Sequence, residues 1–575
     1  MILVLKEYLS LLKESRELDA LLPDLLLSMG FSILSRPQIG VKQFGVDLAA
    51  VGKAENGEKK LFLFVVKQGD IDRNTWDNGS NAVMQTFMQV LNVYIPKHIP
   101  EECANLKINI ILCTGGDLLQ VIIDDWTGFK KQNKTNNIDF QFWGGDQLSK
   151  YIEQYMLNEH IISNEYRSLL RKTLSLLPEP SYEMADYYKI LQLLFFKNKT
   201  KKVLQKEIEK RLRTANLMLD IVLAWARDAD NLRPAVLAAE RTVLNAWNYI
   251  ADLNSKRSKK VTDSFINIYM SLTSIYSEYI NKFISYYGYK NGLNGFSCSG
   301  DSDVETIVLF EHQGILATCG CLNLLIGSRN KDPGRIKNAM AVCENLKQLI
   351  PNHPCLYNPL YDSHSIEISL TIFLLLGFHE IEFLSNYIYQ LINHIAFAYN
   401  VMGKHFPADM DKFEDVIIES KENKNDFMQL STLFMQLAAW IACIGDEQLY
   451  VCFLKIVKYI FPKTYTQYWY PDKKAEDVIY TENAGFHTGY TAVIHPLPDK
   501  IEDMQKILEE KPPEQLNLSD FSCFQSGLPE LLFIASRHFR TPFISEFITD
   551  MYRGKEQADK VISQKAADTV KKPEL

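Results

Sequence analysis

The sequence lacks the cysteine patterns of a secreted or zinc-binding protein. Its 10 cysteines include no C-x-x-C pair, and the tight pair Cys319 and Cys321 has no second pair at zinc-binding spacing. From Lys6 onward the first residues alternate charge with leucine, so the apolar core of a secretory signal is missing. We therefore expect reduced thiols, no disulfide framework and a cytoplasmic protein.

Long apolar runs and common catalytic motifs are missing as well. The most apolar stretches, 368–378 and 430–445, fall short of the roughly 18 residues that a membrane span needs, and we expect both to be buried helices. There is no GxxxxGK[ST] loop, GxSxG elbow or HExxH pair, which excludes the usual P-loop, α/β-hydrolase and zinc-protease signatures. A net charge of -8 excludes a chain that coats nucleic acid over its whole surface, although a local basic groove is allowed.

What is present is a composition that folds. The chain has 575 residues, 47% of them hydrophobic, so it can bury large cores and should form at least two domains. A charged fraction of 23% and an aromatic fraction of 11% are typical of folded proteins and not of disordered ones.

Residues 1–175 mix helical and strand patterns and are predicted to form one α/β domain. Leucines at helical spacing occupy residues 1–30, and further helices are expected at 79–94, 118–130 and 146–157. Alternating or continuous apolar runs predict strands at 31–38, 44–53, 60–68, 107–116 and 138–144. The first three strands suit an antiparallel meander and the later ones suit crossover units, which predicts a mixed sheet with flanking helices.

The pattern changes after a Pro-containing linker at 177–183. From there the chain is dominated by long helical patterns, and residues 180–550 are predicted to form a large all-α domain, or two subdomains. No fixed repeat of 30–45 residues is present, so a solenoid is not indicated. Residues 551–575 are predicted to be a polar tail.

The stretch from Gly40 to Asp70 carries the clearest chemical signal. It predicts a hairpin with Asp47 on one strand and Lys67 at the end of the next, within reach of each other. Aspartate is unfavourable in strands, so an aspartate inside an apolar strand points to a site. Asp47 would ligate a metal ion, and Lys67 would orient or activate water for cleavage of a phosphodiester.

The first 160 residues resemble the PD-(D/E)XK nuclease superfamily, nearest to its Mrr-type restriction endonuclease branch. The resemblance rests on a helix ending in Gly30-Phe31, the phrase Gly45-Val46-Asp47 and the lysine Lys67, in that fixed order. It implies a restriction-endonuclease-like fold, a Mg²⁺ or Mn²⁺ cofactor, endonuclease activity on DNA, and a place in bacterial restriction or anti-phage defence.

The sequence departs from the family at Val65, where the family places Glu, Asp or Gln two residues before the lysine. The resemblance suggests that Asp19 on the first helix is a further metal ligand, together with the backbone carbonyl of Val66. Gln68, Gln85 and Asp70 are weaker candidates for the missing polar group.

Two other functions stay open besides the metal-dependent endonuclease. The sheet can bind nucleic acid without cutting it, or the chain can be an interaction protein whose helical domain contacts a protein partner or a second copy. Basic segments at 197–213 and 255–260 can contact a phosphate backbone or be solvated surfaces. Trp76, Trp126 and Trp143 are expected in the core rather than in base stacking. No membrane partner is expected.

Overall fold

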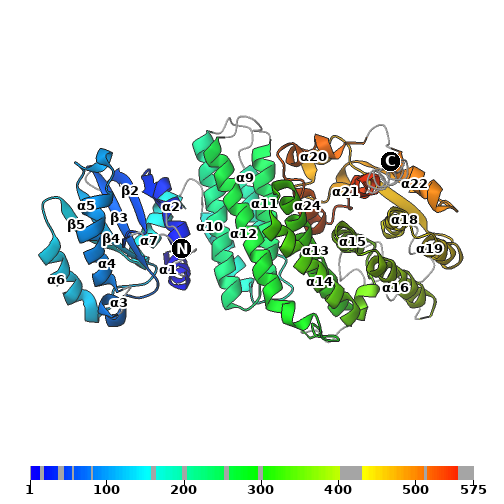
Figure 1. Cartoon of the computed structure of the whole chain (residues 1–575), viewed down its shortest axis with the longest axis horizontal. Coiled ribbons are helices and arrows are strands. Elements are labelled where there is room, and N and C mark those ends of the chain that lie inside the picture. Colours follow the sequence, from blue (N-terminus) through cyan, green and yellow to red (C-terminus); the bar gives the residue numbers. More distant parts are fainter. Residues whose placement is uncertain are drawn as a thin grey trace, which may run out of the picture. The chain divides into compact units, whose positions relative to one another are not determined.

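The structure is a computed structural model. In it the chain folds into two compact units (Figure 1). The first unit comprises residues 1–238 and 258–271, and the second comprises residues 239–257 and 272–575. The structure describes residues 2–12, 18–35, 44–54, 57–78, 82–156, 164–196, 204–251, 258–295, 302–401, 430–510 and 515–554. The domain boundary near residue 178 and the polar tail from 551 stay predictions, and most of that tail lies outside the described residues.

A five-stranded mixed sheet organises the first unit, as the sequence predicts. Its strands are β1 (Ser32–Ser35), β2 (Leu48–Lys53), β3 (Lys59–Lys67), β4 (Ile108–Thr114) and β5 (Ile138–Trp143), in that spatial order. The pairs β1–β2 and β2–β3 are antiparallel, whereas β3–β4 and β4–β5 are parallel. Every residue of β4 is buried, which explains its continuous apolar sequence.

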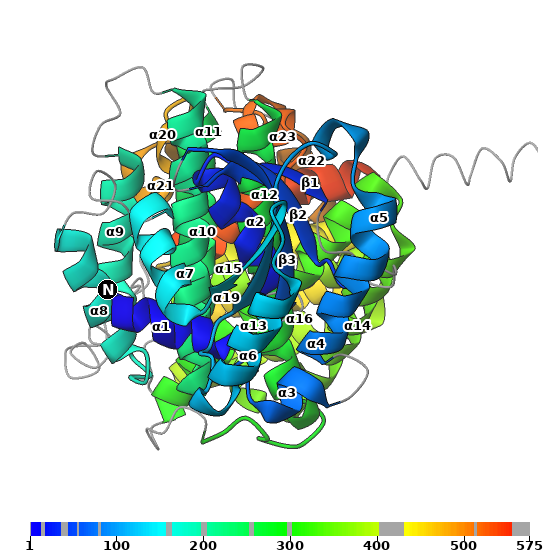
Figure 2. The same cartoon turned by 90° about the vertical axis from the view of Figure 1, so that its left-hand side faces the viewer.

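Helices cover both faces of this sheet (Figures 1 and 2). On one face lie α3 (Arg73–Asp77), α4 (Val83–Gln89) with the π-helical turn Val90–Tyr94, α5 (Ile95–His98) and α6 (Ile123–Asn133). On the other lie α1 (Ile2–Leu11), α2 (Asp19–Ser28) and α7 (Gly145–Tyr151). We call these the α4 face and the α2 face.

Alternation along β3 divides its side chains between the two faces. Leu61, Leu63 and Val65 join the apolar core under α4. Phe62 and Phe64 project to the α2 face, where their rings lie 5.0 Å from Phe31 and 5.2 Å from Trp143 between centroids. Trp76, Trp126 and Trp143 are at most 8% exposed, so their predicted role in the core is confirmed.

The rest of the chain is largely helical. The long helices are α8 (Asn164–Leu176), α9 (Ala185–Phe196), α10 (Gln205–Asp228), α11 (Arg233–Ile250), α12 (Lys259–Phe283), α13 (Ser302–Asn330), α14 (Pro333–Asn352), α15 (Ser365–Gly377), α16 (Ile381–Asn400), α18 (Thr432–Ile444), α19 (Glu447–Ile460), α22 (Ile501–Glu509) and α24 (Leu531–Phe539). Three single-turn helices are α20 (Ala475–Val478), α21 (Ala484–His487) and α23 (Ser522–Gln525).

The prediction of an all-helical region is wrong in one place. A second sheet joins β6 (Leu430–Ser431), β7 (Tyr465–Tyr470) and β8 (Tyr490–Ile494), with β6–β7 parallel and β7–β8 antiparallel. Both longer strands are rich in tyrosine, threonine and other residues that favour extended backbone. These strands are short, and the helical patterns on either side hide them in the sequence.

One helix among the described residues, α13, passes a length and composition test for a membrane span, with mean hydropathy 1.3 over its best window. Alanine, glycine and cysteine keep α13 apolar on average, although no uninterrupted apolar run reaches the roughly 18 residues that the sequence analysis looked for. Of that window, 72% is buried inside the structure, as in a core helix of a soluble protein. The nine cysteines in the described ranges are free thiols.

The helix α1 packs directly on the loop after β4. A Cβ added to Gly115 would lie 1.9 Å from the carbonyl oxygen of Leu9, so Gly115→Ala forces α1 away from the sheet. We expect this substitution to lower the free energy of unfolding by about 1–3 kcal/mol, measured by urea denaturation. Gly128→Ala is the matched control: nothing lies within 4 Å of the added Cβ on α6, so it should be neutral or stabilising. Equal effects of the two substitutions would contradict this packing.

Candidate functional site

Asp47 lies at the edge of the sheet where β2 begins and β3 ends. Leu48, the first residue of β2, pairs with Phe64, and the backbone N–H of Asp47 donates to the Phe64 carbonyl at 2.9 Å. The Asp47 carboxylate then accepts a hydrogen bond from the Val66 N–H, with 2.7 Å between Oδ2 and N. Its position is therefore fixed beside the last residues of β3.

The loop that carries Asp47 needs a glycine two residues earlier. Gly45 has φ +84°, and a Cβ there would lie 2.8 Å from the carbonyl oxygen of Thr86 on α4. Only glycine combines this left-handed backbone with so close an approach. The glycine of the phrase Gly45-Val46-Asp47 therefore packs against α4 at Thr86, the residue after Gln85 in the sequence.

Lys67 is the last residue of β3 and lies at the same edge as Asp47. Strand alternation assigns Lys67 to the α4 face, together with Leu63 and Val65. Cys113 lies on the other face: burial raises the pKa of its thiol, and the nearby charge of Asp47 raises it further. Cys113 pairs with Val66 across β3 and β4. The structure thus brings the predicted acid and lysine to one edge of the sheet.

Asp19 lies on α2, the helix that packs on β1 and β2. It is the first residue of α2, and the helix ends only a few residues before β1, through Gly30 at φ +88°. The helix therefore runs back along β1, and its N-terminus points toward the end of the sheet where β2 begins. Asp19 is half-buried, and its Oδ1 atom is shielded from solvent.

The two predicted glutamines are both exposed. Gln68 follows β3 directly and stands at the site edge, whereas Gln85 lies in the first turn of α4. The Asp70 side chain is engaged nearby, since its Oδ1 accepts the backbone N–H of Asp117 at 2.8 Å.

Val65 is fully buried in the apolar core of the α4 face, with 0% of its surface exposed. Its side chain supplies no ligand, and an acid at this position would be desolvated among leucine and isoleucine side chains. Valine at position 65 therefore leaves the Asp47 edge without the polar side chain that the nuclease family has two residues before the lysine.

The donor chemistry at this edge fits a magnesium ion in its simplest form. Mg²⁺ commonly takes one or two protein carboxylates and completes its shell with water and phosphate oxygens. Asp47 and Asp19 would be such carboxylates, with the Val66 carbonyl as a third oxygen from the protein. Within the described ranges, no group of three or more His, Cys, Asp or Glu residues is placed to hold a metal ion.

Lys6, which the sequence analysis did not identify, forms two ion pairs at the ends of the neighbouring strands β4 and β5. The Lys6 Nζ atom on α1 lies 2.9 Å from an Asp117 oxygen and 3.1 Å from an Asp146 oxygen. These aspartates follow β4 and β5, so Lys6 holds α1 over the carboxyl ends of the parallel strands. No spacing pattern connects Lys6 to either aspartate, and the sequence carries no signal for this contact.

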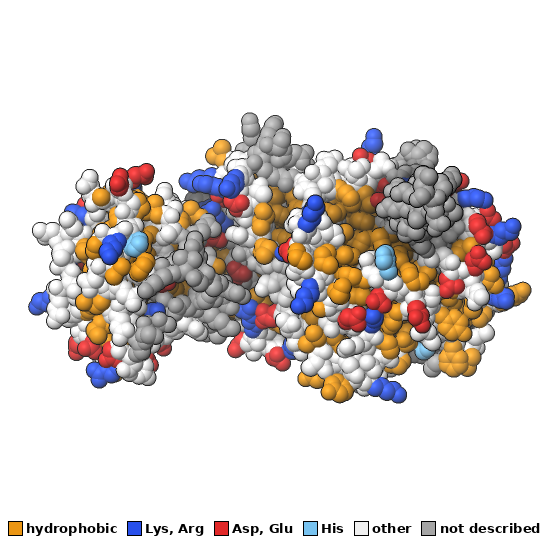
Figure 3. Space-filling view, in the orientation of Figure 1, with side chains coloured by type: hydrophobic (Ala, Val, Ile, Leu, Met, Phe, Trp, Pro, Cys, Tyr) orange, Lys and Arg blue, Asp and Glu red, His pale blue; other side chains and the backbone are white. Residues whose placement is uncertain are grey.

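Two arginines in the described part of the first basic segment form ion pairs within α10. Arg211 and Arg213 on α10 lie 3.4 and 3.0 Å from the carboxylates of Glu207 and Glu209, one turn earlier. On the face drawn in Figure 3, lysine, arginine and acidic side chains are scattered among apolar and uncharged ones. Residues 197–203 and 255–257 of the two basic segments lie outside the described residues.

Comparison with models of known protein families, with curated proteins and with solved structures finds no match for this chain. The resemblance to nucleases rests on the residues and their placement alone.

Proposed function

We propose that the Asp47 edge of the N-terminal sheet is a metal-dependent endonuclease site that hydrolyses phosphodiester bonds of DNA. One observation carries the proposal: the Asp47 carboxylate is held by the Val66 N–H, one residue before Lys67. A fixed carboxylate that can hold a metal ion, close in the fold to a lysine, supports metal-assisted hydrolysis of a phosphodiester.

Each side chain has a distinct part in this proposal. Asp47 and Asp19 would hold Mg²⁺ or Mn²⁺, which when bound neutralises the non-bridging oxygens and lowers the pKa of water. Asp47 keeps one orientation because the Val66 amide fixes one of its oxygens. The Lys67 ammonium group would approach the phosphate from the α4 face and balance its charge, and Gln68 would contact the backbone of the substrate.

The test is cleavage of plasmid DNA by the purified full chain with Mn²⁺ or Mg²⁺. Asp47→Asn keeps an oxygen for the Val66 N–H, so the fold should persist while cleavage falls at least about 100-fold. Lys67→Met should have a comparable effect. Asp77→Asn, at an exposed position of α3, is the matched control and should cleave normally. Equal cleavage by the wild type and the Asp47 variant would remove the proposal.

The second candidate is a nuclease-like sheet that binds nucleic acid or a partner protein without cutting. The burial of Val65 favours it, since the usual second acid has been replaced by a core residue. In that case a mobility shift of DNA should persist in chelator, and no cleavage should appear with any divalent ion. Loss of the shift in chelator would instead favour the metal-dependent site.

The remaining helices would sense, gate or assemble around this activity, in a cytoplasmic protein of bacterial restriction or anti-phage defence. This part of the proposal is by analogy with the nuclease family.

A further inference from the structure

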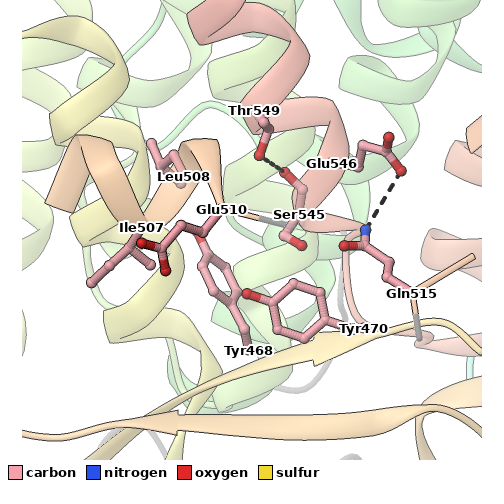
Figure 4. A pocket seen from close by; sticks show the side chains of 9 residues that line it. All are labelled: Tyr468, Tyr470, Ile507, Leu508, Glu510, Gln515, Ser545, Glu546 and Thr549. Carbon is pink, nitrogen blue, oxygen red and sulfur yellow. Dashed lines mark hydrogen bonds between the residues drawn. The ribbon is translucent and has the colours of Figure 1, made fainter. Parts of the chain in front are cut away.

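The second unit contains a small pocket that is lined on one side by Tyr468 and Tyr470 of β7 (Figure 4). Tyr468 and Tyr470 are two residues apart on the strand, so both rings project from the same side. They are only 2% and 8% exposed, and their centroids lie 5.8 Å apart in an edge-to-face arrangement. The other lining residues are Ile507, Leu508, Glu510, Gln515, Ser545, Glu546 and Thr549.

The Tyr468 hydroxyl is buried and has no hydrogen-bond partner among the described residues. Buried hydroxyl groups in folded proteins are nearly always bonded, because an unpartnered one destabilises the fold. Thr549 donates to the backbone carbonyl of Ser545, so its hydroxyl is already engaged. A group that enters the pocket and bonds to Tyr468 would therefore be favoured.

Carboxylates give the pocket its charge. Glu546 is 5% exposed, and its Oε2 accepts the Leu518 N–H at 2.9 Å and the Gln515 side-chain amide at 3.5 Å. Glu510 is exposed at the mouth. None of the nine lining side chains is a lysine, arginine or histidine. The lining thus offers acceptors and negative charge, which suits a ligand that is positive and rich in hydrogen-bond donors.

The size of the pocket limits that ligand. The volume available to the centre of a water-sized group is about 10 Å³. This is close to the smallest cavity that holds one water molecule. An unsubstituted ammonium group is about as large as water, whereas a trimethylated one is much larger. Tyrosine rings also attract cations at short range.

We propose that this pocket binds the ammonium group of a primary alkylamine, carried by a lysine side chain or by a free small amine. The ammonium group donates to the Tyr468 hydroxyl and is balanced by the negative charge of the lining residues Glu510 and Glu546, and its alkyl stem leaves along Ile507 and Leu508.

The test is titration of the full chain with n-butylammonium chloride at constant ionic strength, following the thermal unfolding midpoint. We expect a saturable rise of the midpoint, and at least tenfold weaker binding in Tyr468→Phe. That variant should fold, because it removes only a hydroxyl without a protein partner. Tyr465→Phe on the same strand, at a position 46% exposed and outside the pocket, should bind like the wild type.

Tetramethylammonium chloride is the size control and should give no saturable rise. N-acetyl-lysine methylamide provides the second arm: tighter binding than butylammonium assigns the site to a protein lysine, and weaker binding assigns it to a free amine. Three results would overturn the proposal. They are no saturable rise, an equal rise with tetramethylammonium, and unchanged binding in Tyr468→Phe.

Discussion

Replacing Glu240 by alanine is expected to destabilise the second unit by about 3–5 kcal/mol. Glu240 on α11 is fully buried and accepts hydrogen bonds from Arg537, His538 and Tyr276. Arg537 is itself only 4% exposed, so removing the carboxylate leaves its charge in a nonpolar interior. A buried cation that has lost its counter-charge is among the most costly defects in a folded protein.

The geometry also fixes the protonation of His538. Burial lowers the pKa of His538 well below its usual value, and the charges of Arg241 and Arg537 lower it further. The neutral ring donates from Nδ1 to Glu240 and accepts from the Arg241 Nε–H at Nε2, with 3.0 Å in each contact. The histidine therefore links two charged groups without carrying a charge.

Urea denaturation of the full chain measures the Glu240 effect. Glu344→Gln is the matched control, because Glu344 is 55% exposed and pairs with Lys347 on the surface of α14, so its loss should change stability by at most about 0.5 kcal/mol. A double replacement of Glu240 and Arg537 by methionine should recover most of the lost stability, since neither charge is then buried alone. A single replacement of Glu240 that costs no more than the control would contradict this network.

The second unit is also expected to lose stability steeply in mild acid. His312 is 3% exposed, and its two ring nitrogens lie 3.1 and 2.9 Å from the hydroxyl oxygens of Tyr279 and Tyr287. Burial, with a smaller contribution from His353, lowers the pKa of His312 to about 3. An unfolded histidine has a pKa of about 6.5, so between these values the unfolded chain binds a proton that the folded chain does not.

The sign follows from that difference. As pH falls below about 6.5, protonation favours the unfolded chain, and His312 alone removes roughly 1.4 kcal/mol per pH unit, up to about 5 kcal/mol near pH 3. His364 and His538 add to this slope, because burial lowers the pKa of each well below its usual value. Denaturant midpoints measured between pH 7.5 and pH 5 report the effect.

Two variants separate His312 from the general effect of acid. His312→Phe should be less stable at pH 7.5, because two tyrosine hydroxyls lose a hydrogen-bond partner. Its free energy of unfolding should also fall less steeply as the pH is lowered, by the contribution of one proton. His487→Gln, at a side chain 53% exposed, should leave the slope unchanged. An unchanged slope in His312→Phe would show that His312 is not kept neutral by the fold.

Short-range patterns explain what the sequence could predict. The meander of β1, β2 and β3 follows from alternating apolar residues and a glycine turn, and parallel β4 follows from its continuous apolar run. The placement of Asp47 and Lys67 at one edge follows from the hairpin, because the start of one strand meets the end of the next. Each depends on residues close together in the chain.

Long-range contacts explain what the sequence could not predict. Glu240 and Arg537 are 297 positions apart, and no local pattern marks either as a partner of the other. The start of β2 is irregular, because the Asp47 N–H bonds to the Phe64 carbonyl although Phe64 pairs with Leu48. A one-residue irregularity of this kind reverses the face of a side chain and is invisible to periodicity.

The measurement that tests the account most directly is Mn²⁺ binding, followed by the electron paramagnetic resonance signal of the free ion in the presence of a short DNA duplex. It reports on the Asp47 edge without requiring cleavage. The account predicts that the wild type binds at least one Mn²⁺ at least about tenfold more tightly than Asp47→Asn, while Asp77→Asn binds like the wild type. Identical Mn²⁺ binding by the wild type and Asp47→Asn would contradict a metal-dependent site at this edge of the sheet.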